Sequence, residues 1–245
     1  MRIESVTVLH YGLSYLPFAL ESVLGHVDRA VVCYTPHPSH GSRASVGCPE
    51  GERELEAAAR SMGPKVHWEK VTAFWQEGQH RDYAYSLCDD ADLMIVLDAD
   101  EVWDPDVLER VIKAVADGTA RTWRLRFTTP WRSFRWVCRD DMLPERVRDN
   151  RGRRATPYGH VPPELGPVWH FGYAVTDDVM RYKLQIHGHR AEWRDKWWEE
   201  KWAPWPPVQD VHPTCEGFWN PEPMDAELLP ELMRAHPFWD REKIE

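Results

Sequence analysis

The sequence predicts an α/β protein with a mixed, mainly parallel sheet flanked by helices, and three observations support this. Segments with the pattern of strands alternate with segments of helical periodicity through residues 1–120. The apolar run 93–97 leads straight into acidic residues, as a strand buried on both faces of a sheet does. The segment 191–245 is rich in Trp and Pro and is expected to pack on the α/β part as a C-terminal extension.

Each strand and helix of the first part is predicted from its own pattern. The expected strands are 3–9, 30–34, 66–68 and 93–97, and the expected helices are 16–27, 52–62, 78–88 and 105–115. Ser14 is expected to cap the first helix, Gly63 to end the second, and Asp104 to cap the fourth. Such alternation predicts right-handed crossovers between parallel strands.

Two loops at the carboxyl edge of the predicted sheet carry candidate binding residues. Tyr11 and Gly12 lie between the first strand and its helix, where α/β sheets bind ligands. Asp98 and Asp100 follow the buried strand, and in extended chain both carboxylates aim at one point while Glu101 faces elsewhere. Carboxylates suit Mg²⁺ or Mn²⁺, whose coordination shell is often completed by substrate phosphates. The sequence therefore predicts a metal and diphosphate site here.

The simplest alternative is that these acids only end the strand and begin the next helix. Asp104 and Pro105 already supply that helix with an N-cap and a first residue. Asp98 and Asp100 are thus left without a structural role, and we favour the metal-binding one.

Length, charge and cysteine content narrow the class of protein. A chain of 245 residues is long enough for one large domain, or for a domain with an extension. The formal net charge of −10 argues against a protein that coats nucleic acid, although it allows a local basic groove. No apolar run approaches the ~18 residues of a membrane helix and no signal peptide is visible, so we expect no membrane span and a cytoplasmic location. Five scattered cysteines without a C-x-x-C pair fit that reducing compartment.

A basic and aromatic segment, here called the Arg–Trp region, extends from Arg121 to Arg154. It holds eleven Arg against four acids, and Trp131, Phe134 and Trp136 are interleaved with the Arg residues. Arg binds phosphate oxygens in a bidentate manner and aromatic rings stack on sugars or bases, so the region suits an anionic ligand. A surface hairpin whose Arg stems cover apolar residues explains the pattern equally well.

Two motifs resemble those of a known family. Arg81-Asp82-Tyr83-Ala84 and Leu97-Asp98-Ala99-Asp100-Glu101 together resemble the R-N-x-A … L-D-x-D-E pattern of glycosyltransferases with the GT-A fold, the family-2-like inverting enzymes in particular. The resemblance implies a GT-A, Rossmann-like fold in which the D-x-D acids hold a metal ion on the diphosphate of a nucleotide sugar. It also implies that Arg81 contacts a phosphate or the ribose. The family more often has Asn where Asp82 stands, and loop 35–49 lacks the Asp that usually contacts the base.

The same resemblance implies a metal-binding role for His170. GT-A enzymes commonly place one His from a later strand on the metal, and His170-Phe171-Gly172 is similar to such strand ends. A neutral imidazole can complete a carboxylate site for Mn²⁺, although a His on a short apolar segment is more often a core residue. His187 and His189 form a rival pair, but no Cys lies near them to complete a structural zinc site. Lys183 and His187 are candidate contacts of the diphosphate.

The expected activity is transfer of a hexosyl or pentosyl group from a UDP- or GDP-sugar to an acceptor hydroxyl, with Mn²⁺ or Mg²⁺ as cofactor. Inversion needs a base near the acceptor oxygen, and Asp141 is the first candidate and Glu145 the second. Either acid alone is more simply explained as a loop residue. The Arg–Trp region is compatible with an anionic acceptor. The acceptor classes considered are a glycan, a small molecule and a modified base in nucleic acid.

The chain is expected to divide near residue 190. Residues 1–190 would form the catalytic domain, with a nucleotide-sugar and metal half at 1–120 and an acceptor half at 121–190. Residues 191–245 would form the extension, in which a helix over 225–236 is expected.

Two other functions fit parts of the sequence. A metal-dependent phosphohydrolase or phosphotransferase also uses acids at a strand end, but its haloacid-dehalogenase-like version needs a Thr after D-x-D, where Glu101 stands. The hypothesis of a nucleic-acid or polysaccharide binding module is supported by the Arg–Trp region alone.

Overall fold

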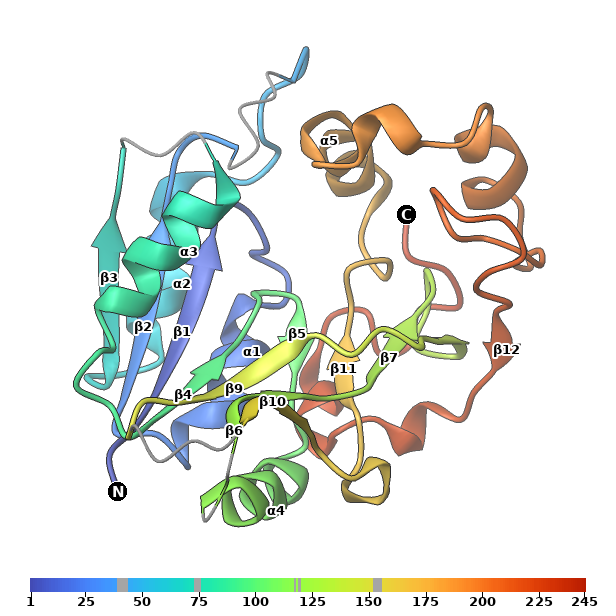
Figure 1. Ribbon diagram of the computed structural model, residues 1–245. Coiled ribbons are helices and arrows are strands. Elements are labelled where there is room, and N and C mark those ends of the chain that lie inside the picture. The colour runs from blue at the N-terminus through green and yellow to red at the C-terminus, as the bar shows by residue number, and fades with distance from the viewer. Residues whose placement is uncertain (39–43, 73–75, 117, 119, 152–155) are drawn as a thin grey trace.

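The structure, a computed structural model, describes residues 1–38, 44–72, 76–116, 118, 120–151 and 156–245. Within these residues it contains a seven-stranded sheet in the order β10-β6-β9-β4-β1-β2-β3 and a five-stranded sheet in the order β12-β8-β7-β11-β5. Figure 1 shows the N-terminal elements of the larger sheet, in blue and teal, on one side of the molecule. The C-terminal chain, in orange and red, lies on the other side.

Parallel strands form the centre and one edge of the larger sheet. They are β1 (Ile3–Leu9), β2 (Arg29–Tyr34), β3 (Val66–Lys70) and β4 (Leu93–Val96). Next to β4, β9 (Glu145–Asp149) runs antiparallel to both β4 and β6 (Ala120–Arg124), and β10 (Thr156–His160) is parallel to β6. The predicted α/β class, with a mixed and mainly parallel sheet flanked by helices, is confirmed.

Helices cover both faces of this sheet. They are α1 (Leu16–Leu24), α2 (Glu52–Ser61), α3 (Glu77–Ser86) and α4 (Pro105–Ala116). Neighbouring strand residues point to opposite faces, so Val32 packs in one core with α1, α2 and α4, while Val31 packs with Ala84 of α3. Among the described residues, no helix combines the length and the apolar character needed to cross a membrane.

The chain first enters the smaller sheet directly after β4 of the larger sheet. Its strands are β5 (Glu101–Val102), β7 (Phe127–Pro130), β8 (Trp136–Arg139), β11 (Val168–His170) and β12 (Glu222–Pro223). β5 follows β4 after one turn, so Asp98 and Asp100 lie where the chain passes from one sheet to the other. β11 pairs antiparallel with β5 and places His170 opposite Glu101.

One predicted helix cap is confirmed and another is wrong. The Asp104 carboxylate accepts the N–H groups of Asp106 at 2.8 Å and Val107 at 3.1 Å, as predicted for the start of α4. Ser14 does not cap α1, which begins after Tyr15 without a side-chain cap. The Ser14 carbonyl instead faces the C-terminal segment, a contact that no local pattern could reveal.

The later part of the chain departs most from the predicted helices. The prediction of a helix over 225–236 is wrong, because Pro230 interrupts that segment. Proline has no N–H to donate within a helix, and it disfavours the helical conformation in the residue before it. Two short 3₁₀ helices, η4 (Ala226–Leu228) and η5 (Glu231–Ala235), stand there instead. The short helices before them are η1 (Pro163–Leu165), η2 (Arg190–Glu192) and the π-type η3 (Trp198–Trp202). An unpredicted helix, α5 (Asp177–Ile186), has Thr176 as its N-cap.

The extension contributes to a large aromatic core. Trp131 and Phe134 of the Arg–Trp region are fully buried. Trp131 packs edge-on against Trp197, Trp202 and Trp219 at centroid distances of 6.1, 5.5 and 6.4 Å. The interpretation of these two rings as a stacking surface for a ligand is therefore wrong, because the extension covers them. The domain boundary at 190 stays a prediction.

The Arg residues of the Arg–Trp region are divided between core and surface. Arg132 is buried and pairs with Asp177 at 2.8 Å, and Arg146 is buried beside the D-x-D turn. The exposed members are Arg121, Arg126, Arg135 and Arg139. Arg153 and Arg154 lie outside the described residues. The region is thus not one continuous basic surface.

His236 connects the end of the chain to the loop that precedes α1. Its ring stacks on Tyr15 at a centroid distance of 4.6 Å. Its Nε2 lies 2.9 Å from the Ser14 carbonyl oxygen, and its Nδ1 accepts the Phe238 N–H at 3.1 Å. The second contact requires an unprotonated Nδ1, so Nε2 carries the proton and the folded state holds a neutral imidazole.

We predict that this histidine makes the protein sensitive to acid. Burial lowers the pKa of His236 from 6.5 to about 4, so its contribution to stability is complete above pH 6.5 and is lost as the pH falls towards 4. That contribution is at most roughly 3 kcal/mol at 1.36 kcal/mol per pKa unit. Urea unfolding at several pH values should show a flatter pH dependence for His236→Gln than for wild type. The exposed His189→Gln is the control, and equal pH dependences for His236→Gln and wild type would contradict the prediction.

Candidate active site

The D-x-D acids lie in a turn. β4 ends at Val96, and the turn after it is closed by the Glu101 N–H, which donates to the Asp98 carbonyl at 3.0 Å. The expectation that extended chain aligns Asp98 with Asp100 is therefore wrong, because the backbone bends here to change sheets. Both side chains nevertheless line one cavity.

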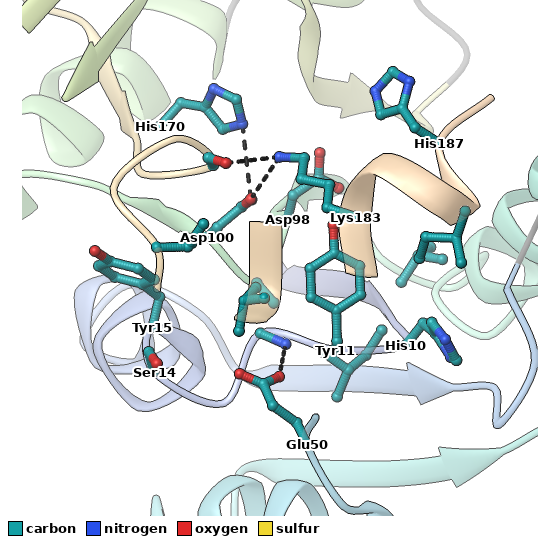
Figure 2. A pocket seen from close by; sticks show the side chains of 18 of the residues that line it. His10, Tyr11, Ser14, Tyr15, Glu50, Asp98, Asp100, His170, Lys183 and His187 are labelled. Atoms are coloured by element: carbon teal, nitrogen blue, oxygen red, sulfur yellow. Dashed lines mark hydrogen bonds and ion pairs between the residues drawn. The ribbon is translucent and has the colours of Figure 1, made fainter. Parts of the chain in front are cut away.

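This cavity, of about 280 Å³, lies at the carboxyl ends of β1 and β4 (Figure 2). The predicted site residues that line it are Tyr11, Gly12, Arg81, Asp98, Asp100, His170, Lys183 and His187. Asp141 and Glu145 are not among the described residues that line it; Asp141 is exposed and Glu145 is the first residue of β9. The role of these two acids as a catalytic base stays a prediction.

Gly12 brings the two predicted loops into contact. A Cβ on Gly12 would lie 2.8 Å from the Cβ of Ala99, and the φ of Gly12 is +132°, a conformation that other residues rarely adopt. The loop that carries Tyr11 therefore packs directly on the D-x-D turn. Glu50, which the sequence did not single out, binds the N–H groups of Gly12 and Leu13, the latter at 2.8 Å.

Asp98 is held by two guanidinium groups. One carboxylate oxygen lies 3.4 Å from Arg81 Nη1 and the other 2.8 Å from Arg146 Nη2. Burial raises the pKa of Asp98, but Arg81 and Arg146 outweigh it and hold this pKa well below its usual range. Asp98 is therefore ionised with both oxygens engaged.

Arg146 also holds the third acid of the motif. Its Nε donates to Glu101 Oε1 at 3.0 Å, and its Nη2 contacts the same oxygen. Burial raises the pKa of Glu101 to about 8, although Arg146 acts to lower it. The sequence did not single out Arg146, because it stands among many Arg residues and only strand pairing of β9 with β4 brings it here.

Asp100 faces His170 across the cavity. Asp100 Oδ2 lies 3.8 Å from His170 Nε2, and His170 Nδ1 lies 3.5 Å from the Thr129 hydroxyl. Burial lowers the pKa of His170 to about 4, against the opposing effect of Asp100, so the imidazole is neutral at physiological pH. The Phe171 N–H donates to the Asp100 carbonyl at 2.7 Å and fixes the two segments together.

Lys183 reaches the same point from α5. Its Nζ lies 4.0 Å from Asp100 Oδ2 and donates to the Gly172 carbonyl at 2.8 Å. Burial lowers the pKa of Lys183, and Asp100 acts to raise it. His187, just after α5, lines the cavity and packs edge-on against Trp193.

The residues around Asp100 fit a divalent metal ion. A carboxylate oxygen and a neutral imidazole nitrogen 3.8 Å apart can both bind one ion at the usual ligand distances of about 2.0–2.2 Å. The described residues hold no cluster of three or more His, Cys, Asp or Glu side chains suited to a metal, so an ion would need further ligands from substrate or water. The metal-binding role of Asp98 stays a prediction, and it would require a guanidinium group to release one oxygen.

Comparisons with known proteins give no close relative. No family model and no curated protein matches the sequence. One similar solved structure is glucosyl-3-phosphoglycerate synthase from Mycobacterium tuberculosis, in complex with Mn²⁺, uridine diphosphate and phosphoglyceric acid. It is 10% identical, with a TM-score of 0.44 over 69% of this chain and 70% of that one. A mycobacterial protein is 11% identical, with a TM-score of 0.38 over 53% of this chain and 41% of the other. The function is therefore inferred from this chain's own residues.

Proposed function

We propose that this chain is a metal-dependent glycosyltransferase that moves a sugar from a nucleotide diphosphate donor to an acceptor hydroxyl. The observation that supports this best is the convergence of Asp100, His170 and Lys183 at the carboxyl edge of the sheet. A carboxylate, a neutral imidazole and an ammonium group thus face one cavity. Such a set suits a diphosphate together with a divalent cation.

Each predicted site residue that lines the cavity has a proposed role. Asp100 and His170 would hold Mn²⁺ or Mg²⁺, which when bound supplies positive charge to the leaving diphosphate. Lys183 and His187 would bind diphosphate oxygens through charge-assisted hydrogen bonds. The proposed nucleotide contacts are Tyr11, Gly12, Arg81 and Asp98.

The acceptor half of the reaction rests on fewer observations. A base for an inverting step, proposed as Asp141 or Glu145, would have to approach the cavity from the strand and loop that follow β8. The exposed Arg residues of the Arg–Trp region favour an anionic acceptor, whether glycan, small molecule or modified nucleic acid.

The proposal predicts that activity depends on metal. Incubation with a panel of UDP- and GDP-sugars and Mn²⁺ should release nucleoside diphosphate, because the donor diphosphate meets Asp100 unfavourably without an ion. EDTA should abolish this release and added Mn²⁺ should restore it. Release of inorganic phosphate from simple phosphoesters, with no turnover of any nucleotide sugar, would favour the phosphohydrolase instead.

A further inference from the structure

We infer that Lys183 couples the binding of the metal to the binding of the diphosphate. The positive charge of its ammonium group weakens the binding of a cation at Asp100 and His170 while the cavity holds no anion. Once diphosphate oxygens lie against Lys183, their negative charge offsets this repulsion. This inference rests on the proposed function and assigns Lys183 a second role within it.

The side chain of Lys183 is held where it must interact with a bound cation. Only 8% of the residue is exposed, and Nζ donates to the Gly172 carbonyl at 2.8 Å. Nζ also lies 4.7 Å from the centre of the Tyr173 ring, which covers it on one side. Moving the ammonium group into solvent would break these contacts.

Gly172 shows how closely the metal site and Lys183 approach. A Cβ on Gly172 would lie 2.6 Å from His170 Nε2 and 2.8 Å from Lys183 Nζ, so both nitrogens sit against the same small residue. Figure 2 shows both nitrogens directed at the Asp100 carboxylate, which lies 3.8 Å from one and 4.0 Å from the other. An ion shared by Asp100 and His170 would have Lys183 as its immediate neighbour.

The charged side chains around this point already face partners. Arg81 faces Asp98 and Glu77, and Arg146 faces Asp98 and Glu101. Asp100 and Lys183 remain as one negative and one positive charge. A divalent cation added alone would leave the buried end of the cavity with an excess of positive charge, which costs more here than in water. A diphosphate supplies the missing negative charge, so the two ligands should bind together more tightly than separately.

The test measures Mn²⁺ binding by calorimetry on metal-free protein, with and without UDP or GDP. Lys183→Met should bind Mn²⁺ alone at least about tenfold more tightly than wild type, because a like charge next to the site is removed. The factor by which UDP or GDP strengthens Mn²⁺ binding should be correspondingly smaller in Lys183→Met. Lys183→Arg keeps the charge and should bind Mn²⁺ alone no more tightly than wild type.

Lys113→Met removes an exposed lysine on α4 and is the control for a change in net charge. Nucleotide-dependent Mn²⁺ binding that is identical in wild type and Lys183→Met would contradict the coupling and leave the proposed function intact. If UDP and GDP leave the Mn²⁺ affinity unchanged in wild type and in every variant, both the proposed function and the coupling are contradicted. Melting temperatures close to wild type establish that each variant is folded.

Discussion

Asp100→Asn is expected to lower the rate of the proposed sugar transfer on the order of 10³-fold, because it removes the carboxylate that faces both His170 and Lys183. The same change should weaken Mn²⁺ binding measured by calorimetry. The Asp100 backbone contact with Phe171 is kept, so the melting temperature should change little.

Asp90→Asn is the matched control, since Asp90 is an exposed acid outside the cavity. It should retain wild-type turnover and wild-type Mn²⁺ affinity. Turnover of Asp100→Asn within a few-fold of wild type would show that Asp100 does not have the proposed role in the site. A large fall in melting temperature with unchanged metal affinity would show that Asp100 is structural.

Arg146→Met is expected to lower the free energy of unfolding by about 1–3 kcal/mol, because it leaves the buried Glu101 carboxyl group without its hydrogen-bond partner. Arg146 is the guanidinium that binds Glu101, and Glu101 is fully buried. Asp98 retains Arg81 in this variant, so most of the loss should come from Glu101. Urea unfolding at neutral pH measures the effect.

Two further variants test this cause. Adding Glu101→Gln to Arg146→Met removes the unpaired carboxyl group and should recover part of the lost stability. Arg126→Met removes an exposed Arg of the same Arg–Trp region and should cost little. Equal losses for Arg126→Met and Arg146→Met would show that the buried ion pair contributes nothing distinctive.

The sequence by itself predicted the alternating strands and helices of the larger sheet. Those elements depend on contacts along one segment: the buried run that ends at Val96, and the cap that Asp104 provides to α4. Their faces repeat with the period of the element, so the pattern is visible without knowledge of the neighbours. The same logic placed Asp98, Asp100 and Gly12 at one edge of the sheet, and the structure brings all three to one cavity.

Local patterns failed where distant segments decide burial. Trp131 and Phe134 were interpreted as a binding surface, but the extension covers both rings. The periodic helix expected over 225–236 was wrong because Pro230 interrupts it, a signal that the sequence contained. α5 was missed although Thr176 caps it.

The tertiary structure alone decided which side chains meet Asp98 and Asp100. His170 reaches Asp100 through the pairing of β11 with β5, and Arg146 reaches Asp98 through the pairing of β9 with β4. Lys183 arrives on α5, where the absence of a side chain at Gly172 leaves room for its Nζ beside His170. Strand pairing between distant segments has no local periodicity, so composition and spacing name candidates for a site, whereas the fold determines their partners and charge states.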